Sequence, residues 1–317
     1  MLSRVADAIY WMGRYLERAE NITRLLLVTE EFSTETQGLE ETVAQTAWKD
    51  LLAMLPTAQL TRPVSAFAPL SLPYLTSFFL DSQNAYSIHF SLRKARENAR
   101  SVREALTVEA FMSINETFRA VDLYAGKGLT DVPGLRDALA STHKGIFSVV
   151  GAIDATFTRD EGWHFLKLGE AVERTYRASV ILQARLPALL ASEPRTDVPL
   201  FYSQWRSLLR ILSSLENYRK VHGARLEPDL VVAFLFFDAQ SPRSLRAGTA
   251  AIREYLEHIA GGRDLTPAAR VIGKLYADLS YADAGAIRAA EVPAFLAGVV
   301  DALIRAHDAL TVQYFVT

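Results

Sequence analysis

Glutamate and arginine recur together on three stretches of this 317-residue sequence, at spacings that place them on one face of a helix. In the first stretch, Gly13, Glu17, Asn21 and Arg24 follow one another three or four residues apart. The planar guanidinium of arginine can bind a carboxylate or phosphate through two hydrogen bonds, so this pattern suits a zwitterionic or carboxylate ligand, or a partner protein. The residues that we expect to provide such binding are Glu17, Arg18, Asn21, Arg24, Arg96, Glu97, Asn98, Arg100, Glu173, Arg174 and Arg177.

The second stretch places four arginines on one helix face, where like charges repel each other. They are Arg93, Arg96, Arg100 and Arg103. Such a face needs carboxylates from elsewhere, an anionic ligand or solvent. Glu97 and Glu104 lie four residues after Arg93 and Arg100, at the spacing of ordinary surface ion pairs.

Three interpretations of the Glu-Arg pairs stay open at this stage. Solvated helix pairs contribute only about a few tenths of a kcal/mol each. Buried pairs would fix how helices pack, and a lost partner would then lower stability. A ligand site is the third interpretation, and an enzyme would require Glu17, Glu97 and Glu173 to converge in a pocket with shifted pKa values.

Other chemistries find little support in the sequence. There is no cysteine, which excludes disulfides, thiolate metal sites and cysteine nucleophiles and favours a reduced compartment. A di-iron site needs two Glu-x-x-His pairs, and only Glu161 with His164 fits. We expect no metal and no cofactor. The net charge of -2 argues against a general nucleic-acid binder.

The elements that must position these residues are expected to be helices throughout, with no sheet. Apolar residues recur at helical spacing from Ile9 to Leu26, from Ile88 to Leu106, and in the window from 160 to 186. Further helices are expected at about 41–55, 108–125, 134–157, 200–221, 228–238, 242–261, 267–281 and 292–315. Residues 63–80 should form an irregular connection that ends in a short apolar helix, and no stretch suits a membrane span or a signal peptide. We expect a cytoplasmic protein.

Helix starts are expected where a capping side chain precedes the periodic residues. Thr266 and Ser241 are each followed by proline, a favourable residue in the first helical turn. Asn84 and Ser3 are the other expected N-caps.

The sequence also indicates an internal duplication. At a shift of 157 residues Trp48 aligns with Trp205, and Asp81 aligns with Asp238. At a shift of 156, the pattern Gly-x-x-x-Glu-Arg at 13–18 aligns with the same pattern at 169–174. We expect one helical domain over 1–317, built from repeats at about 1–157 and 158–317 that are related by a pseudo-two-fold axis.

Three motifs resemble signatures of the bacterial alpha-E family. They are MLSR at 1–4 with YWMGRYLERAEN at 10–21, ARENAR at 95–100, and GEAVER at 169–174. The resemblance spans the whole chain and departs from the family pattern at Asn84-Ala85, where the family tends to have Asn-Pro.

The resemblance implies a pathway and no defined activity. Genes of this family typically neighbour a circularly permuted ATP-grasp protein, which resembles carboxylate–amine ligases, and a transglutaminase-like protein. The implied role is that of an accessory partner in making or modifying a peptide or amino-acid conjugate, with an amino acid or peptide as a candidate ligand. An enzyme that acts on such a substrate and a helical interaction scaffold are the alternatives.

Overall fold

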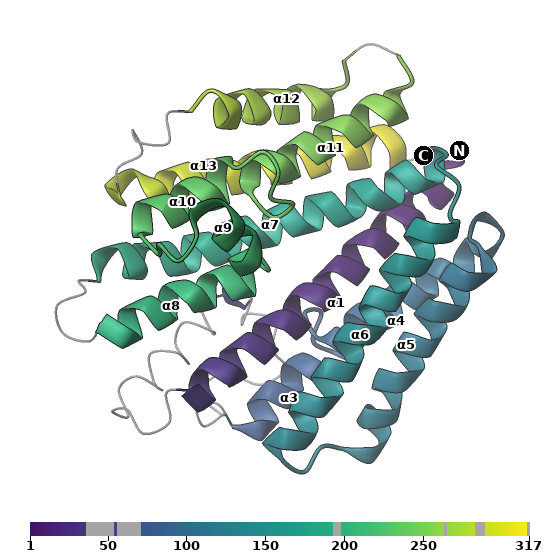
Figure 1. The fold of residues 1–317 in the computed structure, drawn as a ribbon. Coiled ribbons are helices and arrows are strands. Elements are labelled where there is room, and N and C mark those ends of the chain that lie inside the picture. Colours follow the sequence, from purple (N-terminus) through teal and green to yellow (C-terminus); the bar gives the residue numbers. More distant parts are fainter. Residues whose placement is uncertain (36–53, 56–70, 193–197, 263–264, 283–288, 316–317) are drawn as a thin grey trace. The chain divides into compact units, whose positions relative to one another are not determined.

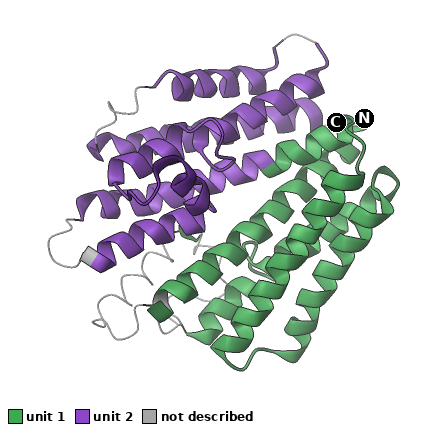
Figure 2. Cartoon of the chain, viewed as in Figure 1, with its two compact units in different colours: residues 1–170 green, residues 171–317 purple. Residues whose placement is uncertain are grey.

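The computed structural model describes residues 1–35, 54–55, 71–192, 198–262, 265–282 and 289–315. Within these ranges every regular element is a helix and no strand occurs, which confirms the expected all-helical class (Figure 1). The chain divides into two compact units, residues 1–170 and 171–317 (Figure 2). No helix in the described ranges combines the length and apolar character that crossing a membrane requires.

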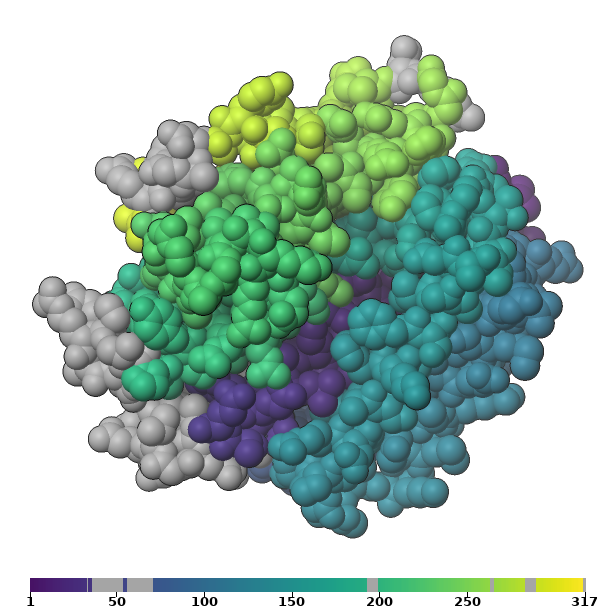
Figure 3. All heavy atoms as spheres, in the orientation of Figure 1, coloured from purple at the N-terminus to yellow at the C-terminus, as the bar shows by residue number. Residues whose placement is uncertain are grey.

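Four long helices of the first unit form a bundle. α1 (Ser3–Glu35) contacts α4 (Ile88–Ser101), α4 contacts α5 (Val108–Lys127), α5 contacts α6 (Val132–Thr156), and α6 returns to α1. The short apolar helix α3 (Leu72–Leu80) contacts all four. In the space-filling view the atoms of α5 and α6 meet along the bundle surface (Figure 3). In such a closed ring of contacts, each helix can bury the apolar stripe on one of its faces.

Among its described residues, the second unit contains most of α7 and six further α-helices. Their bounds are α7 (Glu161–Ala191), α8 (Val198–Ile211), α9 (Leu215–His222), α10 (Pro228–Phe237), α11 (Leu245–Ala260), α12 (Pro267–Ser280) and α13 (Val292–Leu310). α10 contacts α8, α9, α11 and α12, while α12 lies between α11 and α13. The strongly apolar sequence of α10 suits this central position, since half of its residues are buried.

Most expected helices are confirmed, with ends displaced by a few residues. Thr266 caps α12, with its Oγ1 accepting a hydrogen bond from the backbone N–H of Ala269 at 3.1 Å. The helix expected at 200–221 is wrong as a single element: α8 and α9 are separated at Ser213, whose φ of 48° is left-handed and interrupts the helix. The helix expected at 41–55 lies almost entirely outside the described residues.

Two helix starts lie three residues later than expected. Ser87, and not Asn84, caps α4, and Ser244, and not Ser241, caps α11. The reason is a preceding turn: Asn84 accepts a hydrogen bond from the N–H of Tyr86 through its own Oδ1, at 3.0 Å, before the helix begins.

The two capping turns share two kinds of side-chain hydrogen bond. Ser87 Oγ donates to the carbonyl of Asp81 at 2.6 Å, and Ser244 Oγ donates to the carbonyl of Asp238 at 2.5 Å. The Asp81 and Asp238 carboxylates each accept from the backbone N–H two residues later, at 2.9 and 2.8 Å. At a shift of 157 residues, the bounds of α3, α4, α5 and α6 fall within four residues of those of α10, α11, α12 and α13.

Candidate functional site

The first Glu-Arg stretch is buried along α1. Glu17 is 6% exposed, Asn21 2% and Arg24 4%, while Arg18 is slightly more exposed, at 9%. Charged side chains are seldom buried so completely unless ion pairs or hydrogen bonds compensate their lost hydration. The neighbours of this stretch therefore decide what it can do.

The glycine of the first motif allows a close helix crossing. A Cβ built on Gly13 would overlap the carbonyl oxygen of Leu166 in α7 and lie 3.2 Å from the backbone nitrogen of Glu170. Only glycine lets two helix backbones approach this closely. Gly13 thus brings the start of the Glu-Arg motif directly against the first turns of α7.

Arg24 forms an ion pair one turn back along α1, with Glu20. The two side chains are 5% and 6% exposed, and Glu20 Oε1 also lies 3.2 Å from Nε2 of His143 in α6. The carboxylate therefore links α1 to α6. Glu20 could have been inferred from its four-residue spacing to Arg24, whereas nothing in the local sequence identifies His143 as its neighbour.

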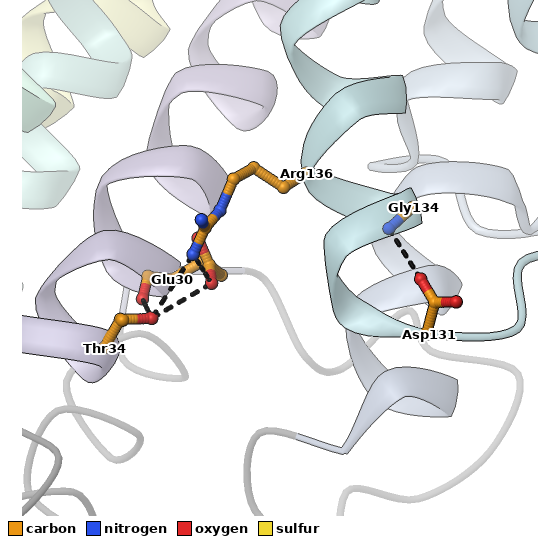
Figure 4. Close-up of polar contacts among 5 residues, drawn as sticks. All are labelled: Glu30, Thr34, Asp131, Gly134 and Arg136. Carbon is orange, nitrogen blue, oxygen red and sulfur yellow. Dashed lines mark hydrogen bonds and ion pairs between the residues drawn. The ribbon is translucent and has the colours of Figure 1, made fainter.

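A second carboxylate of α1 binds α6 nearer the end of the bundle (Figure 4). Arg136 Nε donates to Glu30 Oε2 at 2.7 Å, and its Nη2 donates to Oε1 of the same carboxylate, the two-pronged geometry that arginine favours. Thr34 Oγ1 donates to Glu30 Oε1 at 3.1 Å. Asp131 caps α6 by accepting from the N–H of Gly134 at 2.7 Å, so the start of α6 is fixed beside this pair.

Arginines near the start of α1 stack on aromatic rings. The Arg18 guanidinium lies 5.3 Å from the ring centre of Tyr15 and 5.1 Å from that of Tyr86. Arg14 lies 4.9 Å from the centre of Trp11. These distances fall within cation–π range, so the rings hold both guanidinium groups in position.

The second stretch, on α4, is more exposed than the first. Arg96 Nε donates to Asn115 Oδ1 on α5 at 2.7 Å, and its guanidinium lies 4.9 Å from the ring centre of Phe118. Asn98 is half-buried, and Glu97 and Arg100 are exposed. Part of this stretch therefore holds α4 against α5, and part remains accessible.

The ion pairs expected within α4 are wrong. Glu97 pairs with Lys94 at 2.7 Å and not with Arg93, whose Nη2 donates to the carbonyl of Ser82 at 3.1 Å. Arg100 and Glu104 form no ion pair, because α4 ends at Ser101 and the four-residue helical spacing does not continue.

The third stretch lies on α7 in the second unit. Glu173 is 1% exposed and Arg177 2%, whereas Arg174 is half-buried. In the first unit, Lys167 on the same helix contacts Glu170 at 2.8 Å and Asp154 of α6 at 3.1 Å. Burial lowers the pKa of Lys167, but the two carboxylates outweigh that effect and the net shift is upward.

The two candidate carboxylates of the first unit differ in their exposure to solvent. Glu17 is buried on α1, whereas the side chain of Glu97 is 48% exposed and pairs with Lys94. Glu173 belongs to the second unit. Among the residues that the structure describes, no three His, Asp or Glu side chains are grouped as metal ligands.

Comparison with known proteins places these features in a family. Residues 1–315 match the Alpha-E family, described as a predicted alpha-helical domain with a conserved ER motif. Uncharacterized proteins of Mycobacterium bovis and Mycobacterium tuberculosis are 27% identical to the chain over 331 aligned positions, which cover 97% of this chain and 36% of each relative. The chain thus spans about a third of the length of these relatives. No solved structure matches it.

Proposed function

This chain belongs to the Alpha-E family, and we propose that it is a non-catalytic accessory partner of an ATP-grasp carboxylate–amine ligase system in the cytoplasm. The system would make or modify a peptide or amino-acid conjugate, with a transglutaminase-like protein as a further member. The chain would bind the ligase or its substrate through exposed members of the Glu-Arg set, while the buried members hold the helices together.

One observation carries this proposal. The mycobacterial relatives match nearly all of this chain, yet the match accounts for only 36% of their length. In those proteins the helical domain is therefore joined to about twice its own length of other polypeptide. Two domains that are fused in one protein commonly occur as separate, interacting proteins elsewhere. Fusion raises the effective concentration of each domain near the other.

The burial pattern supports a division of roles among the candidate residues. On α1, Arg24 pairs with Glu20 at almost no exposure, which suits a residue that packs helices. On α4, Glu97 is exposed beside Lys94 and Arg100 is exposed near the helix end. Exposed charges at the edge of an interface influence association rate and partner choice more than folding stability.

We also infer that the chain derives from one duplicated helical repeat, with the two copies at about 1–157 and 158–317. The matching helix order and the hydrogen bonds that the Asp81 and Asp238 turns share support this inference. A local symmetry supports it too: Gly13 faces Leu166 and Glu170, and Gly169 faces the backbone of Tyr10 and Arg14, the residues that correspond at a shift of 156.

The partnership can be tested with the purified chain and the ATP-grasp protein from the same organism. We expect a complex of defined stoichiometry in sedimentation, no ATP hydrolysis by the chain alone, and a changed rate of ADP formation by the ligase when the chain is present. Absence of both complex and rate change would overturn the proposal. Turnover of an amino-acid or peptide substrate by the chain alone would favour the enzyme instead.

Charge reversal locates the surface involved. Glu97→Lys should weaken the complex about tenfold or more, because it places a positive charge where the partner meets a negative one. Glu116→Lys is the matched control, since Glu116 is an exposed glutamate on α5 of the same unit. Equal affinities of the two variants would exclude the α4 surface as the contact.

A further inference from the structure

A pocket of about 790 Å³ lies in the first unit, between the first turn of α1 and the end of α4. Three arginines line it, namely Arg4, Arg100 and Arg103, together with one carboxylate, Glu104. Leu2 and Val5, among others, add apolar surface. The pocket combines an excess of positive charge with an apolar wall.

The pocket lining carries more positive than negative charge, with three arginines and the single carboxylate of Glu104. In the described ranges no carboxylate, Glu104 included, forms an ion pair with any of the three arginines. Arg103 is held in place, since its Nη1 donates to the carbonyl of Leu106 at 3.2 Å and its guanidinium lies 4.5 Å from the ring centre of Phe111. Arg4 and Arg100 are exposed and can turn toward a ligand.

Further features make the site favourable for an anion. Arg4 lies in the first turn of α1, where the helix dipole is positive and a basic side chain is unfavourable unless a negative charge is nearby. Two neighbouring guanidinium groups can each offer a pair of N–H donors to one oxyanion. The volume is within the range of about 300–1,000 Å³ that is typical of small-molecule sites, which leaves room for more than a single anionic group.

We propose that this pocket binds a small molecule with a phosphate or carboxylate group, which Arg4, Arg100 and Arg103 contact while the apolar wall accommodates the rest of the ligand. The site goes beyond the proposed ligase partnership and does not depend on it, because binding can be measured on this chain alone. A result that overturns one of the two proposals would not overturn the other.

Titration calorimetry of the full chain at low ionic strength, with inorganic pyrophosphate and with glutarate as separate probes, tests the site. Binding of pyrophosphate alone would identify phosphate as the ligand group, and binding of glutarate alone would identify a carboxylate. Binding of both would support a general oxyanion site. Binding of neither probe would overturn the proposal.

Variants show whether the bound probe occupies this pocket. Arg100→Gln and Arg4→Gln should each weaken binding about tenfold or more, because each removes charged hydrogen-bond donors. Arg119→Gln, an exposed arginine on α5 away from the pocket lining, should bind as the parent chain does. Thermal melts should show all three variants folded, since these side chains are exposed. Equal weakening by Arg119→Gln would also overturn the proposal, because it would reveal only diffuse charge attraction.

Discussion

Gly13 of α1 and Gly169 of α7 lie at one helix crossing, and each faces the backbone of the opposite helix. A Cβ on Gly13 would overlap the Leu166 carbonyl oxygen, and a Cβ on Gly169 would overlap the Tyr10 carbonyl oxygen. The glycine that opens each Gly-x-x-x-Glu-Arg motif therefore has a packing role. The motif combines a close helix contact with a charged pair one turn later.

Replacement of Gly169 by alanine should separate the two helices. We expect Gly169→Ala to lower the free energy of unfolding by about 1–3 kcal/mol or more, the cost of overpacking where backbone cannot move aside. Gly13→Ala should behave in the same way. Chemical denaturation with circular dichroism measures both.

Gly151→Ala is the matched control for these glycine variants. Gly151 is an exposed residue inside α6, and a Cβ there meets no atom within 4 Å. Alanine should therefore stabilise the helix, by about 0.5–1 kcal/mol. If Gly169→Ala proved as harmless as Gly151→Ala, the close crossing would not exist in solution.

The two carboxylates that link α1 to α6 should differ in what their loss costs. Glu20→Gln removes a carboxylate that is 6% exposed and contacts both Arg24 and His143, so we expect a loss of about 3–5 kcal/mol in the free energy of unfolding. Glu30→Gln removes the carboxylate that pairs with Arg136. The Arg136 side chain is 45% exposed, so water can hydrate its charge in the variant. The loss there should be clearly smaller, since exposed ion pairs add little to stability.

Urea denaturation of the two variants side by side measures this difference. Glu116→Gln on the exposed face of α5 controls for the loss of a surface carboxylate. Equal losses for Glu20→Gln and Glu30→Gln would mean that burial of the Glu20–Arg24 pair does not persist in solution.

Periodicity predicted the helices well because a buried apolar stripe must recur at the helical spacing. It did not locate the helix starts at Ser87 and Ser244, since Asn84 and Ser241 are equally good caps by type and only the folded turn selects among them. It also missed the break at Ser213, because apolar residues continue at helical spacing on both sides of it.

The candidate site was predictable only in part, for a related reason. The spacing of Glu20 and Arg24 on one helix is visible in the sequence. Their neighbour His143 and the Glu30–Arg136 pair join residues more than one hundred positions apart, so tertiary packing alone brings them together. Spacing also cannot distinguish buried Glu17 from exposed Glu97, because each lies next to an arginine on a helix.

The two capping serines offer a matched pair of variants in different units. Ser87→Ala and Ser244→Ala each remove the acceptor for a backbone N–H of the following helix, at 3.0 Å in both cases, and the donor to an aspartate carbonyl. We expect each variant to lose about 1–2 kcal/mol of stability. Ser148→Ala, at an exposed position within α6, should change stability by less than about 0.5 kcal/mol. A loss from only one of the two caps would contradict the equivalence of the turns.

A partly buried carboxyl near the start of α1 should make stability depend on pH. Burial raises the pKa of Asp7 above its ordinary value of 3.8, and a hydrogen bond with the Trp11 side chain offsets part of that rise. The folded chain therefore holds this proton more tightly than the unfolded chain does. As the pH rises from 3.8 through the folded-state pKa, the contribution of Asp7 to the free energy of unfolding falls and then stays low.

Asp7→Asn removes this dependence, because the amide does not ionise and still accepts a hydrogen bond. Relative to the parent chain, the variant should gain stability between about pH 4 and pH 7, with little advantage at the acid end. Urea denaturation at several pH values measures the difference, and Glu116→Gln serves as the surface control. A stability difference that does not change with pH, or one that favours the parent chain at neutral pH, would show that the Asp7 carboxylate is well solvated or stabilised by the helix dipole instead.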